Sequence, residues 1–225
     1  MKGLKFLFNS WRKMPFFFWC GVGVSVVFAV LPFWFHEALG SEDYLFPKIF
    51  LFFPAVFMSE IGIICGCRDI AANKLVRSMP IARALYTRAV PAFVLIVTLG
   101  VSAVVMCAYF IFLGIIGAAA VEFADTLIIG AVVNFLLIAT AAFVTTTPGG
   151  GIVMVYAVIA PLTVLSVAGG DTVIRNGFGL PLWAAALIFI AAVSAAAAVL
   201  YAVSARRYRT ANVKTANPAL QYESK

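Results

Sequence analysis

The stretch that decides the fold of this chain is residues 89–117, which read AVPAFVLIVTLGVSAVVMCAYFIFLGIIG without a single charged side chain. A helix needs about 20 predominantly apolar residues to cross the hydrocarbon core of a bilayer. The apolar residues run on continuously and do not alternate with a period of two, which excludes a strand of a transmembrane β-barrel. Residues 89–117 therefore predict a membrane-spanning α-helix.

Five further apolar runs have a similar length, at residues 15–35, 45–65, 126–145, 150–167 and 181–205. The composition agrees with them, because hydrophobic residues make up 64% of the chain, charged residues 11%, and the mean hydropathy is +1.07. Ordinary globular proteins contain about 45–50% apolar and about 25% charged residues. This excludes a water-soluble domain and a disordered chain. We predict an all-α membrane protein with six transmembrane helices within residues 15–205.

Basic residues are placed unevenly along the chain. Fourteen of the sixteen Lys and Arg residues lie before the first apolar run, between the second and third, or after the sixth, and only Lys48 and Arg175 lie elsewhere. Cytoplasmic segments of membrane proteins carry an excess of Lys and Arg. We therefore expect a multi-pass protein of the cell membrane with both termini in the cytoplasm and residues 206–225 as a cytoplasmic tail. The run at 15–35 exceeds the 7–15 residues of a signal-peptide core, so we expect it to remain as the first span.

Residues 1–14 carry a helical pattern of their own. Apolar side chains recur at helical spacing, at Leu4, Leu7, Phe8, Trp11 and Met14, and polar or basic side chains fill most of the other positions. This pattern predicts an amphipathic helix that lies in the membrane interface. Its cations would be attracted to anionic lipids of the cytoplasmic leaflet, so membrane lipids are expected partners. The alternative is a topology signal with no further role.

The connection at residues 66–88 is the longest on the predicted cytoplasmic side. Residues 69–78 contain no Gly or Pro, and Pro80 disfavours helix at Met79. We expect a short helix, a sharp stop, and a second helical start that leads into the third span. A simple connector needs only a few residues, although a solvated connector with no other function is the alternative.

Within this connection, residues 73–83 read NKLVRSMPIAR. The segment resembles the first cytoplasmic loop of permease subunits of type-2 ABC transporters of the exporter type, the ABC-2 family. The matching positions are Ser78, Pro80, Ile81 and Arg83, while Met79 replaces the usual Leu and Ala82 the usual Ser. The family often has an acidic residue followed by a Gly upstream; Asp69 stands for the acidic residue, but no Gly lies between it and Pro80.

The resemblance implies that this loop contains the coupling helix, which docks into a groove of a separate ATPase subunit. It implies ATPase-coupling roles for Asp69, Leu75, Arg77, Ser78, Met79, Pro80 and Arg83. It also implies a second permease chain, either a copy of this one or a paralogue. The predicted N-terminal interfacial helix, six spans and cytoplasmic termini agree with the same family.

The chain offers no machinery for nucleotide hydrolysis. It contains no Gly-Lys pair, so it lacks the P-loop that cradles phosphates. We expect no enzymatic activity and no cofactor in this chain, with ATP and Mg bound by the partner subunit. Cys65 and Cys67 form a C-x-C without a second Cys pair or a His cluster, so no metal site is expected. No nucleic-acid partner is expected either.

Four residues within the predicted spans are candidates for the translocation path: Glu60, Phe53, Phe57 and Asn134. A charged side chain near the bilayer centre costs about 2.5–3.5 kcal/mol, so Glu60 must be protonated, paired or in a wet cavity. The alternative for Glu60 is a helix-end carboxylate that reaches Arg68 or the headgroups. The alternative for Asn134 is a hydrogen bond to a neighbouring helix. The alternative for Phe53 and Phe57 is contact with lipid and packing.

The function predicted from these features is the membrane-spanning permease subunit of an ATP-driven ABC exporter. Its substrate would be amphiphilic or hydrophobic, such as a peptide, a lipid or a drug. The external connections are too short for a domain that captures a binding protein, which disfavours an importer. An assembly factor without transport is one alternative. An intramembrane enzyme is another, but Glu60 within the second predicted span and His36 at the outer edge of the first do not make a catalytic set.

Overall fold

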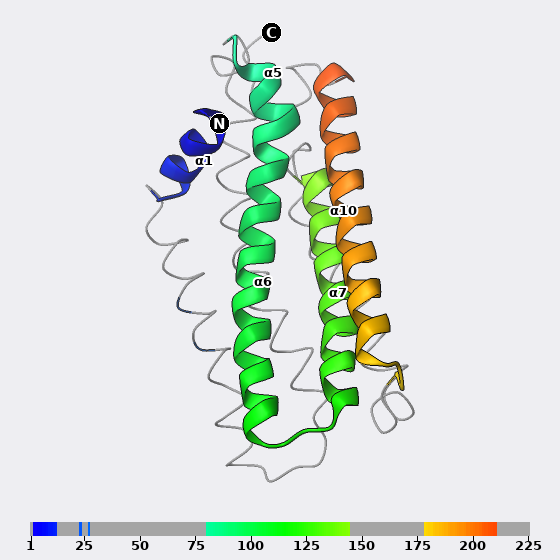
Figure 1. The fold of residues 1–225 in the computed structure, drawn as a ribbon. Coiled ribbons are helices and arrows are strands. Elements are labelled where there is room, and N and C mark those ends of the chain that lie inside the picture. The colour runs from blue at the N-terminus through cyan, green and yellow to red at the C-terminus, as the bar shows by residue number, and fades with distance from the viewer. Residues whose placement is uncertain (1, 13–22, 24–26, 28–79, 145–177, 211–225) are drawn as a thin grey trace, which may run out of the picture.

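The computed structural model describes residues 2–12, 23, 27, 80–144 and 178–210, and these are helical apart from short connections (Figure 1). The helices are α1 (Lys2–Arg12), α5 (Ala82–Ala84), the π-helical turn η1 (Leu85–Ala89), α6 (Val90–Ile115), α7 (Ala120–Val144) and α10 (Leu182–Thr210). The described part contains no strand, which confirms the predicted all-α class for these residues. The predicted spans at 15–35, 45–65 and 150–167 lie outside the described residues, apart from the helical positions 23 and 27.

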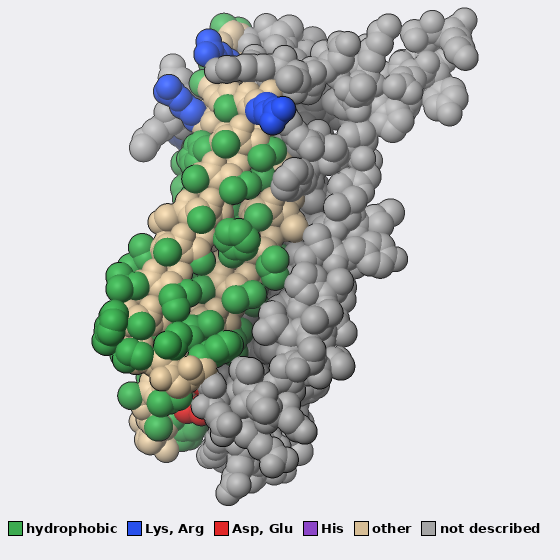
Figure 2. All heavy atoms as spheres, turned by 90° about the vertical axis from the view of Figure 1, so that its right-hand side faces the viewer, with side chains coloured by type: hydrophobic (Ala, Val, Ile, Leu, Met, Phe, Trp, Pro, Cys, Tyr) green, Lys and Arg blue, Asp and Glu red, His purple; other side chains and the backbone are tan. Residues whose placement is uncertain are grey.

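Among the described residues, three helices are long and apolar enough to cross a membrane: Ala82–Ile115, Ala120–Ala142 and Leu182–Arg206. They correspond to the predicted spans at 89–117, 126–145 and 181–205. Hydrophobic side chains cover most of the described face in Figure 2, and basic side chains lie near its upper end. Their length and composition identify the chain as a membrane protein with transmembrane helices.

The helices α6 and α7 form an antiparallel pair joined by a tight turn. The turn closes through hydrogen bonds from the backbone N–H of Ile116 to the carbonyl of Phe112 (3.1 Å) and from that of Ala118 to the carbonyl of Leu113 (3.0 Å). Gly117 has a φ of +68°, a left-handed conformation that suits the residue after a helix end and favours glycine. Because the turn is tight, α7 starts beside the end of α6 and the two helices run in opposite directions.

The third long helix, α10, runs along α7 in the same direction (Figure 1). Within their apolar windows, 61% of the α7 residues are buried inside the protein but only 11% of the α10 residues. Alanines lie fully buried where the two helices meet, at Ala124, Ala185 and Ala196. Small side chains let neighbouring helices approach closely in a membrane. The central position of α7 and the outer position of α10 follow from this packing.

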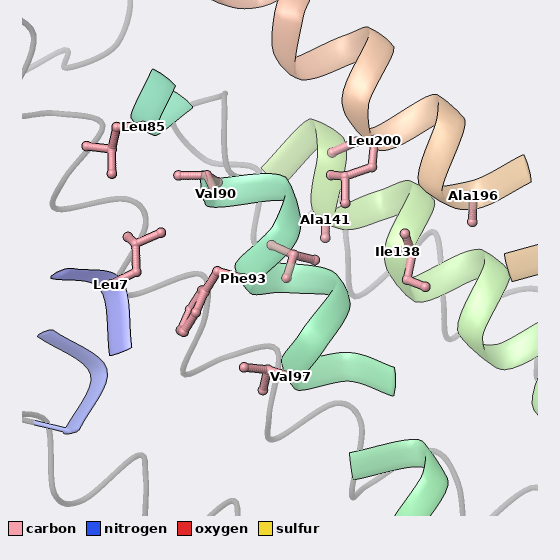
Figure 3. Packing of buried hydrophobic residues seen from close by; sticks show 11 residues of the cluster. Leu7, Leu85, Val90, Phe93, Val97, Ile138, Ala141, Ala196 and Leu200 are labelled. Carbon is pink, nitrogen blue, oxygen red and sulfur yellow. The ribbon is translucent and has the colours of Figure 1, made fainter. Parts of the chain in front are cut away.

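One buried apolar cluster joins five elements (Figure 3). Leu7 of α1 and Leu85 of η1 belong to it, together with the first turns of α6. The cluster continues into α7 with Ile138 and into α10 with Leu200. It therefore ties the N-terminal helix to the same end of all three long helices.

Two helix boundaries differ from the sequence predictions. The helix α7 begins at Ala120 and not at 126, so Glu122 and Asp125 lie in its first turns rather than in an outer connection. The helix α10 continues to Thr210, so the first residues of the predicted tail 206–225 are helical. Hydropathy marks only where a helix meets lipid, whereas backbone hydrogen bonding carries the helix on into polar sequence. An acidic residue in a first turn is moreover favoured by the helix dipole.

Asp125 is buried, with 1% of its surface exposed, and accepts a hydrogen bond from the backbone N–H of Phe178 at 2.9 Å. Phe178 comes shortly before α10, so this bond fastens the start of α10 to the start of α7. We expect Asp125→Ala to destabilise the protein by about 1–3 kcal/mol, because the change leaves a hydrogen-bonding partner unmatched. The measurement is thermal unfolding of the purified full chain in detergent.

Asp125→Asn is the matched control for this prediction, because its side-chain oxygen still accepts a hydrogen bond. It should lose less stability than Asp125→Ala. If the alanine variant unfolds at the wild-type temperature, the bond to Phe178 does not stabilise the fold.

Candidate functional site

Three of the predicted site residues lie in the described part of the chain: Pro80 and Arg83 of the coupling segment, and Asn134 of the translocation path. The others lie outside the described residues: Asp69, Leu75, Arg77, Ser78, Met79, Glu60, Phe53 and Phe57. The described residues nevertheless define two features. One is the end of the helix that leads from Pro80 into α6, and the other is a polar contact between α6 and α7.

A turn at Pro80 and Ile81 precedes a helical start at Ala82, as the sequence predicts for the residues after the proline. The first helical hydrogen bond runs from the backbone N–H of Leu85 to the carbonyl of Ile81 at 2.8 Å. Ala82 and Leu85 are buried, whereas Ile81 (46% exposed) and Arg83 face away from the protein. The elements α5, η1 and α6 form one uninterrupted helix, so these exposed side chains stand at the free end of a membrane-spanning helix.

The π-helical turn η1 interrupts the α-helical hydrogen bonding just before Pro91. The backbone N–H of Val90 donates to the carbonyl of Leu85, five residues earlier, instead of four. In a regular α-helix the Pro91 ring would collide with the carbonyl oxygen of the residue four positions earlier. Pro91 also has no backbone N–H to donate to that oxygen. Widening the preceding turn accommodates the ring and places Pro91 in the first turn of α6, where the missing N–H does little harm. The extra residue also sets the direction in which Arg83 and Ile81 face relative to α6.

The helix α1 packs directly on this π-helical turn. A Cβ atom on Gly3 would lie 3.1 Å from the Cβ of Ala89 and 3.2 Å from the Cδ1 of Leu85, so only glycine fits without a shift. Leu7 is buried, with 2% of its surface exposed, and points toward Leu85 (Figure 3). The rings of Phe8 and Phe93 meet edge to face, with centroids 4.9 Å apart at an angle of 81°.

This contact was missed by the sequence analysis, which assigned the apolar side of residues 1–14 to the membrane interface. Leu4, Leu7 and Phe8 instead pack against η1 and α6, while Lys5, Asn9 and Arg12 are exposed. Gly3 was the one available signal, because glycine inside a short helix often marks a close approach of two backbones. An interfacial location of α1 stays a prediction.

The polar contact between α6 and α7 is centred on Asn134. Its Nδ2 donates to the Oγ of Ser102 on α6 at 2.7 Å and to the carbonyl of Gly130 at 2.7 Å. Ser102 in turn lies 3.8 Å from the sulfur of Met106. Asn134 and Ser102 are both fully buried. A Cβ on Gly130 would come within 3.2 Å of the Met106 sulfur, so glycine is what allows this close packing.

Asn134 thus makes the hydrogen bond to a neighbouring helix that its mid-span position indicates. The sequence analysis did not identify Ser102, because a serine among apolar residues gives no sign of which helix it faces. A role of Asn134 in a translocation path stays a prediction. Among the described residues, no three His, Cys, Asp or Glu side chains come together as metal ligands.

The Ser102–Asn134 bond can be measured with a double-mutant cycle of Ser102→Ala and Asn134→Ala. Hydrogen bonds between membrane helices contribute about 0.6 kcal/mol on average and up to about 1.7 kcal/mol. We expect a coupling free energy within this range in the unfolding of the purified protein. Strictly additive effects of the two substitutions would show that the two side chains do not interact in the membrane.

The docking of α1 can be tested with Gly3→Leu. Forcing a larger side chain into a packed contact costs about 1–3 kcal/mol, so the population of undocked α1 should rise at least about fivefold. Trypsin should then cut the purified protein faster at Lys5 and Arg12. Gly100→Leu is the control, because a Cβ on Gly100 has no atom within 4 Å and should leave the cleavage rate unchanged. Equal cleavage of both variants and the wild type would contradict the contact.

In a comparison with known proteins, no family model, no curated protein and no solved structure matches the chain. The resemblance of residues 73–83 to ABC-2 permeases therefore rests on the sequence motif itself. Of that motif, the structure describes residues 80–83, which form the exposed turn and helical start ahead of α6.

Proposed function

We propose that this chain is the membrane-spanning permease subunit of an ATP-driven ABC exporter in the cell membrane. It would have six spans, both termini in the cytoplasm, and a coupling segment at residues 66–88. The observation that supports this most directly is the exposed end of the α5–η1–α6 helix, because the residues that resemble the family motif stand there. The chain itself would hydrolyse no ATP; a separate P-loop ATPase would bind ATP and Mg.

The geometry of this end suits the transmission of force. Ile81 offers an exposed apolar side chain and Arg83 an exposed cation, on a helical start held in place by the buried Ala82 and Leu85. In protein interfaces, packed apolar anchors govern dissociation, and charges at the rim steer association. A partner docked on this end would act on α6 without an intervening loop, because α5, η1 and α6 are continuous.

The charge distribution supports a cytoplasmic location for the same end. Lys5, Arg12, Arg83 and Arg88 are exposed near it, whereas the described carboxylates, Glu122 and Asp125, lie near the start of α7 at the opposite end of the helices (Figure 2). An excess of Lys and Arg marks the cytoplasmic side. The docking end would therefore face the compartment that holds ATP.

The translocation path would form between this chain and a second permease, either a copy or a paralogue. Glu60, Phe53, Phe57 and Asn134 remain the proposed residues of the path. The proposed substrate is an amphiphilic or hydrophobic molecule such as a peptide, a lipid or a drug. The outer helix α10, with its exposed apolar side chains, would face membrane lipid in this arrangement.

The experiment asks whether a P-loop ATPase is encoded beside this chain, and then measures co-purification of that ATPase and ATP hydrolysis in reconstituted membranes; the absence of such an ATPase would weigh against the proposal. Leu75→Asp should release the ATPase, because it forces an unpaired carboxylate into an apolar contact. Arg83→Gln should weaken the complex severalfold, and most clearly at low salt, where the charge that it removes is least screened. Lys5→Gln removes one charge from the same end outside the coupling segment and should leave co-purification unchanged. Normal co-purification and coupling of Leu75→Asp would place the docking surface elsewhere.

A further inference from the structure

Four of the exposed cations at the Pro80 end have no described carboxylate within their reach. Lys5, Arg12, Arg83 and Arg88 are exposed, and none forms an ion pair among the described residues. Glu122 and Asp125, the carboxylates of the described part, belong to the first turns of α7 at the other end. These positive charges are therefore available to an anion from outside the chain.

Three of the four cations belong to the two elements that pack together, Lys5 and Arg12 to α1 and Arg88 to η1. Lys5 and Arg12 are two helical turns apart and share one side of α1, opposite the side that Leu7 buries. Arg88 directly precedes Ala89, the residue against which Gly3 packs. We call Lys5, Arg12 and Arg88 the basic collar. Since α1 is fixed to η1 by its packing, the members of the collar belong to one packed unit at this end of the molecule.

The depth of the collar matches the headgroup region of a bilayer. The ring of Phe8 in α1 packs on that of Phe93, which lies in the first turns of α6, within the helix that is apolar enough to span the membrane. The collar therefore stands where this helix leaves the apolar layer. Phe6, beside Lys5, is 45% exposed and offers an aromatic ring at the same level. Basic side chains beside an exposed aromatic ring are typical of surfaces that insert into the headgroup and acyl boundary.

We propose that the basic collar binds the headgroup of an anionic phospholipid, with Phe6 against its acyl chains. The guanidinium groups of Arg12 and Arg88 suit a phosphate because each donates two parallel hydrogen bonds, and Lys5 adds a compact charge. This inference specifies which lipids are the membrane-lipid partners in the proposed function. It rests on the part of that proposal that places the chain in a membrane, and not on the ATPase.

Arg83 provides a control of equal charge on the same helix. It lies two residues before Leu85, or about 200° around the helix, so it points away from the face that α1 covers. A diffuse attraction of lipid to net positive charge would treat Arg83 and Arg88 alike. If the basic collar binds the lipid, Arg88→Gln should lower lipid binding and Arg83→Gln should not.

The test measures which lipids the purified full chain retains in detergent, by native mass spectrometry with phosphatidylglycerol and phosphatidylcholine offered in equal amounts. We expect the wild-type chain to prefer phosphatidylglycerol. Lys5→Gln, Arg12→Gln and Arg88→Gln should each lower that preference about fivefold, the effect of one cation near an anionic surface. Lys5→Arg should keep it, and Arg83→Gln should leave it unchanged.

Two results of the lipid measurement would overturn the proposal. One is equal retention of the two lipids by the wild-type chain, and the other is a loss in Arg83→Gln as large as that in Arg88→Gln. Circular dichroism and thermal unfolding of each variant exclude misfolding as the cause of a loss. No ATPase takes part in this measurement, so a failure of the transporter proposal would leave the lipid result intact. Release of the ATPase by collar substitutions with unchanged lipid retention would assign these cations to protein docking and overturn the proposal.

Discussion

A polar group that enters the apolar layer of a membrane is costly unless it finds its hydrogen-bonding partner inside the protein, because lipid supplies none. Three features of the described part answer this constraint, while the Oγ1 of Thr98, the Oδ1 of Asn134 and the Oγ of Ser204 are buried there without a hydrogen-bond partner. Pro91 removes a backbone N–H, and the helix widens into the π-helical turn η1 ahead of it. Asn134 pairs with Ser102 across two helices. Asp125 accepts the N–H of Phe178 and thereby links the starts of two helices. Each solution to a local problem also fixes how neighbouring helices are arranged.

Close packing between helices also stabilises the described part of the protein. Apolar side chains gain little by leaving lipid for a protein interior, so helices in a membrane associate through close contact at small residues. Gly3 admits α1 to the surface of η1, and Gly130 admits Met106 to the surface of α7. Alanines perform the same role between α7 and α10. The buried cluster around Leu7 then joins α1 to the three long helices at one end of the molecule.

That end combines the features from which a function is proposed. The start of the α6 helix has two sides: α1 covers the side of Leu85 and Ala89, and the opposite side presents Arg83. The first side is suited to the lipid surface and the second to a soluble partner. A single rigid helix would therefore connect the membrane interface, the partner subunit and the transmembrane body. Because the π-helical turn lies between Arg83 and α6, it sets the angle between these two sides.

The sequence by itself determined the class of this protein and the position of three spans within a few residues, because the length and continuity of an apolar run reflect bilayer thickness directly. It also determined the break at Pro80 and the helical restart, because proline acts on its own backbone neighbours. The partner of α1, the pairing of Asn134 with Ser102, and the burial of Asp125 were decided only by the tertiary structure. Hydropathy treats all sides of a helix alike and does not show which side meets protein and which meets lipid. Which polar atoms come within hydrogen-bonding distance depends on how two helices are shifted and rotated against each other, and that is fixed by packing between residues far apart in the chain.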